Sequence, residues 1–466
     1  MLPDVALLRV FDFYVHDRWQ GRWYKVVHVC RKWRNLVFGS PTRLNLRLLC
    51  KGGTPVRKTL AIWPSLPIVI IVDDSVDFHI DLDDIIAALK RNDRICRLIL
   101  SDSSSSRLEK LFVEMQQPFP ELTDLDLAAR DERAPVVPAS FLGGSAPQLR
   151  FLTLQSIPFP GLPKILLSAT RLVNLTLRQI PHSGYFLPEA LVTCLSVLTR
   201  LERLVIGLKS PQSRPDRTSR HPPPQTRALL PILTILRFGG ASEYLEDLVA
   251  RSDAPLLDNL KITFFHQLIF DTPHLAQFVS RTPKFNSHDE ARVVFNYLDV
   301  SVTTCDGRLR LENSCRQSDW QLSSLAQICS SAFPHALIST VDHLYIDDGF
   351  HRPRELEDIE ERFHGQEDIE SSQWLELLHP FISVKHLYIS PKSMPSIAFA
   401  LQELIGERVT DVLPALETLF LEKLPSKPVQ ETIEKLLPHG SSSVIQLLFL
   451  AGIRRHQSIF NAFYII

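Results

Sequence analysis

The sequence lacks the features that would place it in several specialised classes of protein. It has 7 cysteines in 466 residues, an odd number at scattered positions. Such a set argues against a disulfide framework and favours reduced thiols in the cytoplasm or the nucleus. The formal net charge is only −1, so the chain has no global electrostatic reason to bind nucleic acid or an anionic membrane.

Long apolar runs are also missing. No uninterrupted apolar segment reaches the ~18 residues that a membrane-spanning helix needs. The start, Met1 to Asp4, lacks the basic and then apolar layout of a signal peptide. The apolar tail after His439 is interrupted by Arg454 and Arg455 and is too short to span a bilayer. We therefore expect no membrane partner.

Motifs for catalysis and for cofactor binding are absent as well. Cys305 and Cys315 are widely spaced, with no C-x-x-C pair that would indicate a zinc site. The turn at residues 51–55 lacks the spacing of a phosphate-binding loop, and no G-x-S-x-G nucleophile elbow occurs. We expect a chain that is not an enzyme and that carries no metal or cofactor.

What the sequence does contain is a repeated hexamer of the form L-x-x-L-x-L. Alternation along a short strand places its last two leucines inward and the residues between them outward. Seven copies begin at residues 95, 122, 149, 172, 201, 233 and 257, at intervals of 23 to 32 residues, and three more begin at 341, 384 and 416. Leucine-rich repeats have periods of roughly 20–29 residues.

These copies predict an α/β fold, a leucine-rich-repeat solenoid with a curved parallel sheet and with helices and loops on its convex side. We expect a linker and a first rung at 46–90, irregular repeats over 91–450 with a mobile loop at 207–227, and a tail at 451–466. Within 280–335 we expect Phe295, Leu298 and Val300 to form one more rung, Leu309 and Leu311 an added strand, and residues 320–333 an amphipathic helix.

Residues 1–38 do not follow the repeat. Proline and aspartate at positions 3 and 4 suit the first turn of a helix, because a missing amide donor is harmless there and a carboxylate meets the positive end of the dipole. Apolar residues then recur at helical spacing, and a second amphipathic stretch runs from Trp23 to Val37. Such short helices cannot bury all of this apolar surface among themselves.

This N-terminal stretch is similar to the F-box. The resemblance rests on Leu2-Pro3-Asp4 with Leu7, Leu8 and Phe11, and on the segment Val29-Cys30-Arg31-Lys32-Trp33-Arg34. The continuation through 38–46 and 63–67 resembles a large set of fungal F-box proteins. One departure is Val5, where the motif usually carries an acidic residue.

The resemblance implies an F-box helical domain at 1–45 that docks on the Skp-type adaptor of an SCF-type cullin–RING ubiquitin ligase, and through it on the cullin. The repeats would then hold an unknown protein substrate, and the ligase chemistry would belong to the partner enzymes. The residues that this implies for adaptor binding are Leu2, Pro3, Leu7, Leu8, Phe11, Val29, Cys30, Trp33 and Leu36.

An alternative remains open at this point. Terminal repeats of a solenoid need a cap, and residues 1–38 could serve only as that cap in a scaffold protein with no ubiquitin-ligase link. Under either hypothesis the ligand face consists of the positions between the inward leucines. Aromatic and basic side chains at such positions anchor protein partners. The candidates are Phe151, Arg203, Arg237, His343, Tyr345, His386 and Tyr388.

Overall fold

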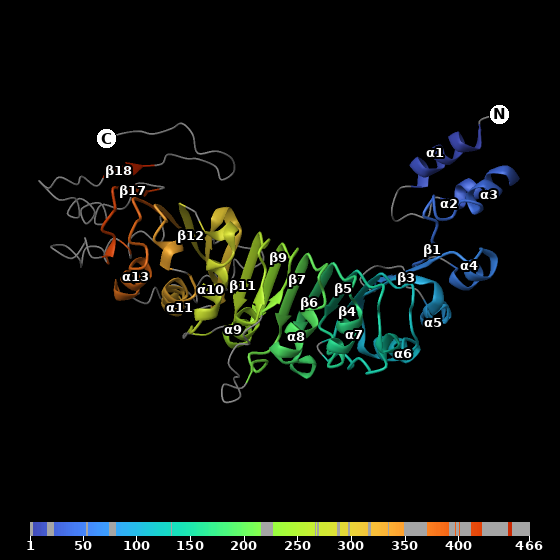
Figure 1. The fold of residues 1–466 in the computed structure, drawn as a ribbon, viewed down its shortest axis with the longest axis horizontal. Coiled ribbons are helices and arrows are strands. Elements are labelled where there is room, and N and C mark those ends of the chain that lie inside the picture. The colour runs from blue at the N-terminus through green and yellow to red at the C-terminus, as the bar shows by residue number, and fades with distance from the viewer. Residues whose placement is uncertain are drawn as a thin grey trace, which may run out of the picture. The chain divides into compact units, whose positions relative to one another are not determined.

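A computed structural model of the chain describes it in two compact units, residues 1–210 and 211–466 (Figure 1). The described residues are 3–15, 23–52, 55–73, 81–131, 133–215, 227–265, 267, 270–286, 289–296, 299–315, 318–333, 335–348, 371–390, 397, 400, 412–421 and 446–449. Most of the predicted mobile loop and all of the predicted tail lie outside them, as does Leu2.

Unit 1 begins with three short helices, α1 (Asp4–Val15), α2 (Trp23–Val27) and α3 (Arg31–Phe38). Cys30 is the N-cap of α3, and its Sγ accepts a hydrogen bond from the Trp33 amide at 3.5 Å. The Lys32 Nζ lies 2.8 Å from an Asp4 carboxylate oxygen and ties α3 to the start of α1. Residues 28–30 form a break, so the second amphipathic stretch is two helices and not one.

These helices share a small core with one another and with the first part of the repeats. The Phe11 ring packs edge-on against Trp33, with the centroids 4.8 Å apart. Trp23 is buried against Trp63 at 5.1 Å, and its indole Nε1 donates to the Arg47 carbonyl at 2.9 Å. Trp63 therefore joins the helices to the segment that enters the sheet.

The sheet of unit 1 consists of parallel strands in chain order. The strands are β1 (Leu48–Cys50), β2 (Ile68–Asp73), β3 (Ile95–Ser103), β4 (Asp124–Ala129), β5 (Phe151–Gln155), β6 (Asn174–Ile180) and β7 (Arg203–Leu208). The connections carry α4 (Val56–Ile62), α5 (Leu82–Leu89), η1 (Asn92–Arg94), α6 (Ser105–Glu114), η2 (Phe141–Gly144), α7 (Leu162–Ser168), η3 (His182–Gly184) and α8 (Pro188–Leu195). Because β1 pairs with β2, the predicted linker already belongs to the sheet.

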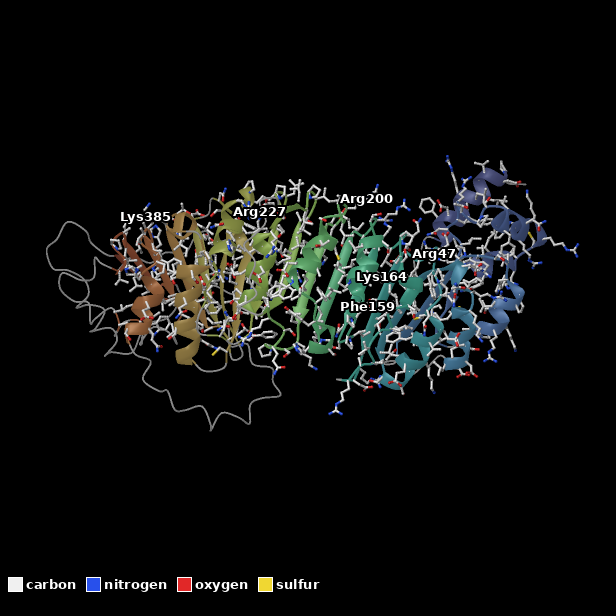
Figure 2. All side chains as sticks on the ribbon, turned by 60° about the horizontal axis from the view of Figure 1, so that its bottom comes forward. Arg47, Phe159, Lys164, Arg200, Arg227 and Lys385 are labelled. Atoms are coloured by element: carbon white, nitrogen blue, oxygen red, sulfur yellow. The ribbon has the colours of Figure 1, made fainter. Side chains whose placement is uncertain are left out.

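The repeated leucines explain why these strands stack. Leu125, Leu152, Leu175 and Leu204 occupy equivalent positions in β4 to β7 and are all buried. Each contributes about 1.5–3 kcal/mol by leaving water, which favours this one register. Helices α6, α7 and α8 lie on the same side of the sheet (Figure 1). Phe159, on the return segment that leads into α7, packs against Phe141 at 5.5 Å (Figure 2).

In unit 2 the strand order departs from the chain order. The order is β9 (Ile235–Gly240), β11 (Asn259–Phe264), β14 (Leu309–Ser314), β13 (Asp299–Thr304), β12 (Glu290–Phe295), β15 (His343–Asp348), β16 (His386–Ile389), β17 (Thr418–Leu421) and β18 (Gln446–Phe449). A separate pair joins β8 (Ala228–Leu229) and β10 (Ser252–Asp253). The helices are α9 (Ser242–Ala250), α10 (Pro273–Ser280), η5 (Pro283–Phe285), η6 (Cys305–Gly307), α11 (Ser318–Ser331), α12 (His335–Ile338) and α13 (Ser371–Leu378).

One sequence prediction for unit 2 was wrong. Phe295 and Val300 do not lie on one rung, because the chain reverses after Phe295 and β13 runs antiparallel to β12; Leu298, the third residue of that prediction, lies outside the described residues. Instead β12 supplies the rung, with Ala291 and Val293 beside Leu344 and Ile346 of β15. The added strand is confirmed as β14, which pairs in parallel with β11. The helix is confirmed as α11, but it is buried on most sides and not amphipathic, since polar Gln321 and Ser324 are buried as well.

The parallel sheets and their leucine stacks confirm the predicted α/β leucine-rich-repeat fold. In the part of the chain that the structure describes, no helix is long and apolar enough to cross a membrane. Six cysteines are free thiols: Cys30, Cys50, Cys96, Cys194, Cys315 and Cys329.

Candidate functional site

The face of the strands that carries the residues between the buried leucines is here called the open face. In unit 2 it presents a row of rings at equivalent positions of β15, β16 and β17, namely Tyr345, Tyr388 and Phe420. Tyr345 and Tyr388 stack with their centroids 4.2 Å apart, and Tyr388 and Phe420 also stack at 4.2 Å. We call these three residues the aromatic ladder.

Both faces of the Tyr345 ring, the first ring of the aromatic ladder, are covered by neighbouring side chains. Tyr388 covers one face, and the guanidinium of Arg292 on β12 lies 5.2 Å from the ring centroid. Arg292 Nε is also 3.5 Å from an Asp347 carboxylate oxygen, which partly neutralises its charge. The ring edges and hydroxyls of Tyr345 and Tyr388 are therefore what the ladder offers to a ligand, because Phe420 is buried.

A pair of histidines lies beside the ladder. His343 and His386 hold equivalent positions on β15 and β16, with their rings 4.5 Å apart. His343 Nε2 is 3.6 Å from an Asp342 carboxylate oxygen, and the Tyr388 hydroxyl is 3.4 Å from His343 Nδ1. Burial, and then the neighbouring His343, lower the pKa of His386. The predicted concave-face residues of β15 and β16 thus come together in one cluster.

On β11 and β14, toward the other end of the open face of unit 2, basic side chains surround the carboxylate of one acidic residue. The Glu312 carboxylate contacts Lys261 Nζ at 3.0 Å and Arg310 Nε at 2.6 Å, and it accepts a hydrogen bond from the Thr263 hydroxyl at 2.7 Å. Burial would raise the pKa of Glu312, but the hydrogen bonds from Thr263 and Lys261 and the charge of Arg310 hold it below its ordinary value. The predicted residue Arg237, on β9, pairs with the position of Lys261 on β11 and is half-buried.

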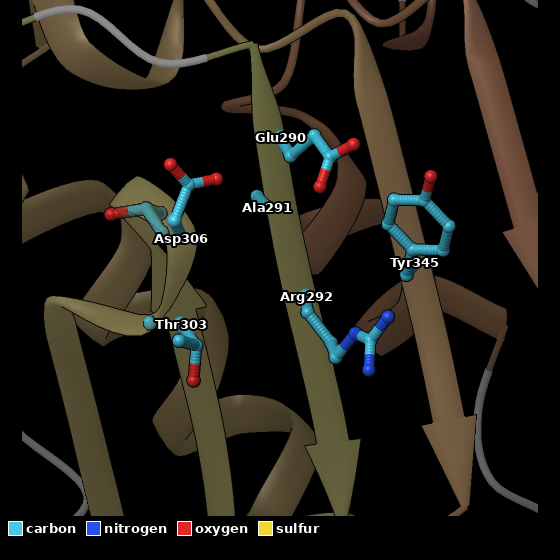
Figure 3. A pocket seen from close by; sticks show the side chains of 8 residues that line it. Glu290, Ala291, Arg292, Thr303, Asp306 and Tyr345 are labelled. Atoms are coloured by element: carbon cyan, nitrogen blue, oxygen red, sulfur yellow. The ribbon is translucent and has the colours of Figure 1, made fainter. Parts of the chain in front are cut away.

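A pocket of about 260 Å³ opens between the two ends. It lies where the antiparallel β12–β13 hairpin interrupts the parallel sheet, and it is lined by Glu290, Ala291, Arg292, Thr303, Thr304, Asp306, Gly307 and Tyr345. Figure 3 shows the Glu290 carboxylate on the side of β12 that faces Tyr345 and the Asp306 carboxylate on the other side of this strand, with the Arg292 side chain extending toward Tyr345. The pocket therefore has a carboxylate beside the first ring of the ladder.

The open face of unit 1 is mixed in charge. Phe151, Asn174 and Arg203 hold equivalent positions on β5, β6 and β7, which brings two predicted residues into one row. Arg97 Nη1 lies 3.7 Å from an Asp124 carboxylate oxygen in the same row. Phe151 is 36% exposed, whereas Arg203 is half-buried. This row has no counterpart of the aromatic ladder.

The residues predicted to bind the adaptor divide into two sets. Leu7, Leu8 and Phe11 are buried in the core of unit 1, so they hold α1 in place and have little surface to offer. The others present more surface to solvent: Pro3, Val29 and Cys30 are exposed, and Trp33 and Leu36 are half-buried.

Sequence reasoning missed a group of exposed apolar side chains on α1 as candidate interface residues. Val10 is 55% exposed, Phe13 90% and Tyr14 41%, so a contiguous apolar strip faces solvent on this helix. The helical period was the available signal, since Val10 lies three and four residues from Phe13 and Tyr14 and the three residues are therefore neighbours on the helix surface. Glu290 and Asp306 were missed because the reversal between β12 and β13 left no pattern in the sequence.

Among the described residues, no group of three or more His, Cys, Asp or Glu side chains could hold a metal ion. Burial raises the pKa of the Tyr345 and Tyr388 phenols, so both stay protonated and are able to donate hydrogen bonds. A repeat fold that exposes such side chains provides an extended surface for binding other molecules.

Neither family models nor curated proteins match this chain. Among solved structures, the leucine-rich-repeat protein LegL7 of Legionella pneumophila is similar at 12% identity and a TM-score of 0.27, covering 84% of this chain and 97% of that one. The internalin InlF of Listeria monocytogenes is similar at 10% identity and a TM-score of 0.20, covering 81% of this chain and 90% of that one.

Proposed function

We propose that this chain is the substrate-recognition subunit of an SCF-type cullin–RING ubiquitin ligase. The N-terminal helices would bind the Skp-type adaptor, and the open faces of the repeats would bind the protein target. The supporting observation is the exposed apolar strip of Val10, Phe13 and Tyr14 on α1. Apolar side chains this exposed and this close together are typical of a protein interface.

The strip can supply the energy of a specific complex. Complete burial of Phe13 against a partner contributes roughly 1.5–3 kcal/mol, and Val10, Tyr14 and Val29 add to it before the costs of association. Removing the apolar contribution of Phe13 alone is therefore expected to weaken binding by about 10-fold or more.

A second function is favoured by the contacts of Trp63. Trp23, Tyr24, His28 and Phe38 all pack on this ring, at 5.1, 5.4, 5.8 and 6.0 Å. A helical segment held this firmly to the first rung suits a cap of a leucine-rich-repeat interaction protein that has no ubiquitin-ligase link. The two functions differ in whether the exposed strip of α1 has a partner.

Co-purification of the full chain with a Skp-type adaptor separates them. We expect a stoichiometric complex that survives moderate salt and that is lost in Phe13→Asp with an unchanged melting temperature. Val113→Asp is the matched control, because Val113 is 65% exposed on α6, away from the N-terminal helices. Absence of a complex with the unaltered chain would refute the ligase function and leave the repeat interaction protein.

A further inference from the structure

The pocket at the β12–β13 hairpin contains two negatively charged side chains, Glu290 and Asp306. Glu290 and Asp306 are both exposed, and among the described residues neither carboxylate has an ion-pair partner. Arg292, the only basic residue in the lining, is already engaged by Asp347 and by the Tyr345 ring. The two carboxylates of the pocket are therefore available to a cation from outside the chain.

The dimensions and the wall of the pocket favour a long organic cation. Its volume of about 260 Å³ is several times the roughly 30 Å³ that one water molecule occupies in the liquid. Tyr345 forms one side, with its phenol kept neutral by burial, by Tyr388 and by the nearby Glu290 carboxylate. Lysine and arginine bury their aliphatic stems along such apolar surface while the charged head reaches a polar group.

The mouth of the pocket is open to an approaching chain. An added Cβ at Gly307, on the turn between β13 and β14, would meet no atom within 4 Å. Beyond Tyr345 the half-buried Tyr388 continues along the open face at the equivalent position of β16. A segment lying across the ladder can therefore direct one side chain into the pocket.

We propose that the pocket lined by Glu290, Asp306 and Tyr345 binds a lysine or arginine side chain of a partner protein. Glu290 and Asp306 pair with the charged head, and Tyr345 contacts the aliphatic stem. This assignment deepens the proposed function and rests on the part of it in which the repeats bind a protein target. It does not depend on adaptor binding.

The test uses the full chain and fluorescein-labelled nonapeptide pools with a fixed central residue and random flanks. One pool has lysine at the centre, and the matched pool has norleucine, which keeps the stem and removes the ammonium. We expect the lysine pool to bind about 10-fold more tightly by fluorescence polarisation, as for hydrogen bonds to a charged group. This preference should shrink with added salt because the pocket is open to solvent.

Two double variants make the test specific to the pocket. In Glu290→Gln with Asp306→Asn, the lysine preference should fall to about 2-fold or less, in a chain of unchanged melting temperature. The control, Asp93→Asn with Glu121→Gln, removes the same charge from exposed sites of unit 1 and should keep the preference.

Equal binding of the two pools, binding of neither, or a lysine preference that persists in the pocket variant would overturn the assignment. Failure of adaptor co-purification would leave it intact, because that experiment concerns α1. If the chain neither binds the adaptor nor prefers the lysine pool, each result refutes its own proposal.

Discussion

The ring of Tyr388 lies 4.2 Å from the ring of Phe420, and the two planes differ by only 3°. The near-parallel stack follows from the strand pairing, because residues at equivalent positions of parallel strands β16 and β17 are held at the spacing of the sheet. Tyr345 extends the stack on the other side. The ladder is therefore a rigid feature of the open face, and its central ring supports both neighbours.

Replacing that central ring should destabilise unit 2. Tyr388→Ala removes two stacking contacts and is expected to cost roughly 2–4 kcal/mol of unfolding free energy, since the ring is only partly buried. Tyr388→Phe keeps both stacks and loses only the contacts of the hydroxyl with His343 and Tyr345, so a cost of about 1 kcal/mol or less is expected. Urea denaturation followed by circular dichroism measures both.

Tyr388→Phe is the control for Tyr388→Ala, because it removes the hydroxyl and keeps the ring. Similar losses for Tyr388→Ala and Tyr388→Phe would mean that the hydroxyl, and not the stacked ring, holds the ladder. A double-mutant cycle between Tyr345 and Tyr388 should give a coupling of about 0.5–1.5 kcal/mol.

The carboxylate of Glu312 should stabilise the fold at neutral pH. Its pKa is lowered in the folded chain, despite burial, by Thr263, Lys261 and Arg310. A lowered pKa means that this contribution is present above the unfolded value of about 4.3 and is lost as the pH falls through the folded value. Glu312→Gln should therefore cost roughly 1–3 kcal/mol at pH 7 and progressively less in acid.

Denaturation of Glu312→Gln at several pH values checks this sign. Glu376→Gln, at an exposed position of α13, is the matched control and should change stability by less than about 0.5 kcal/mol. A cost that is independent of pH would contradict the electrostatic account.

The parallel sheet was predictable because the repeated hexamer alternates with the period of a strand. Leu152 and Leu154 point inward, and Phe151 and Thr153, which alternate with them, lie on the open face, as expected. The ladder followed from the same rule, because His343-Leu344-Tyr345 and His386-Leu387-Tyr388 repeat one pattern on two strands. Local alternation determines which face a side chain takes, so this part of the site could be read from single segments.

The pocket could not be predicted, because it depends on a reversal that interrupts the repeat. Val300 and Val302 alternate as in any strand, and nothing in that pattern distinguishes antiparallel from parallel pairing. On α1, the similarity to a family drew attention to Leu7, Leu8 and Phe11, whose burial depends on tertiary contacts with the other helices. Exposure of Phe13 is the consequence of that packing.

On the open face of unit 1, Asp126 and Asp124 should respond in opposite ways to loss of charge. Burial raises the pKa of Asp126, and Arg97 and Arg178 only partly offset this. A raised pKa means that the stability linked to this group is complete below the unfolded value of about 3.9 and is lost as the pH rises through the folded value. Asp126→Asn should therefore raise the melting temperature at pH 7, with the gain disappearing toward pH 4.

Asp124→Asn provides the contrast on the same strand. Asp124 pairs with Arg97 at 3.7 Å and accepts a hydrogen bond from the Thr123 hydroxyl at 2.6 Å, so its replacement should lower the melting temperature at pH 7. Thermal unfolding of both variants between pH 4 and pH 7 measures the difference. A decrease for both would show that Arg97 needs each carboxylate and that burial of Asp126 is not the dominant effect.

The pKa of His386 should depend on the histidine at the equivalent position of the neighbouring strand. The pKa of His386 is lowered by burial, by His343 and by Lys385, while Glu417 and Asp342 act to raise it. A lowered histidine pKa means that the stability linked to His386 is present above the unfolded value of about 6.5 and is lost as the pH falls through the folded value.

His343→Gln removes a like charge whose ring is 4.5 Å away, so the pKa of His386 should rise. Nuclear magnetic resonance of labelled histidine side chains measures this shift, with the exposed His379→Gln as the control that should leave it unchanged. A pKa of His386 that does not respond to His343→Gln would mean that burial, and not the neighbouring ring, lowers it.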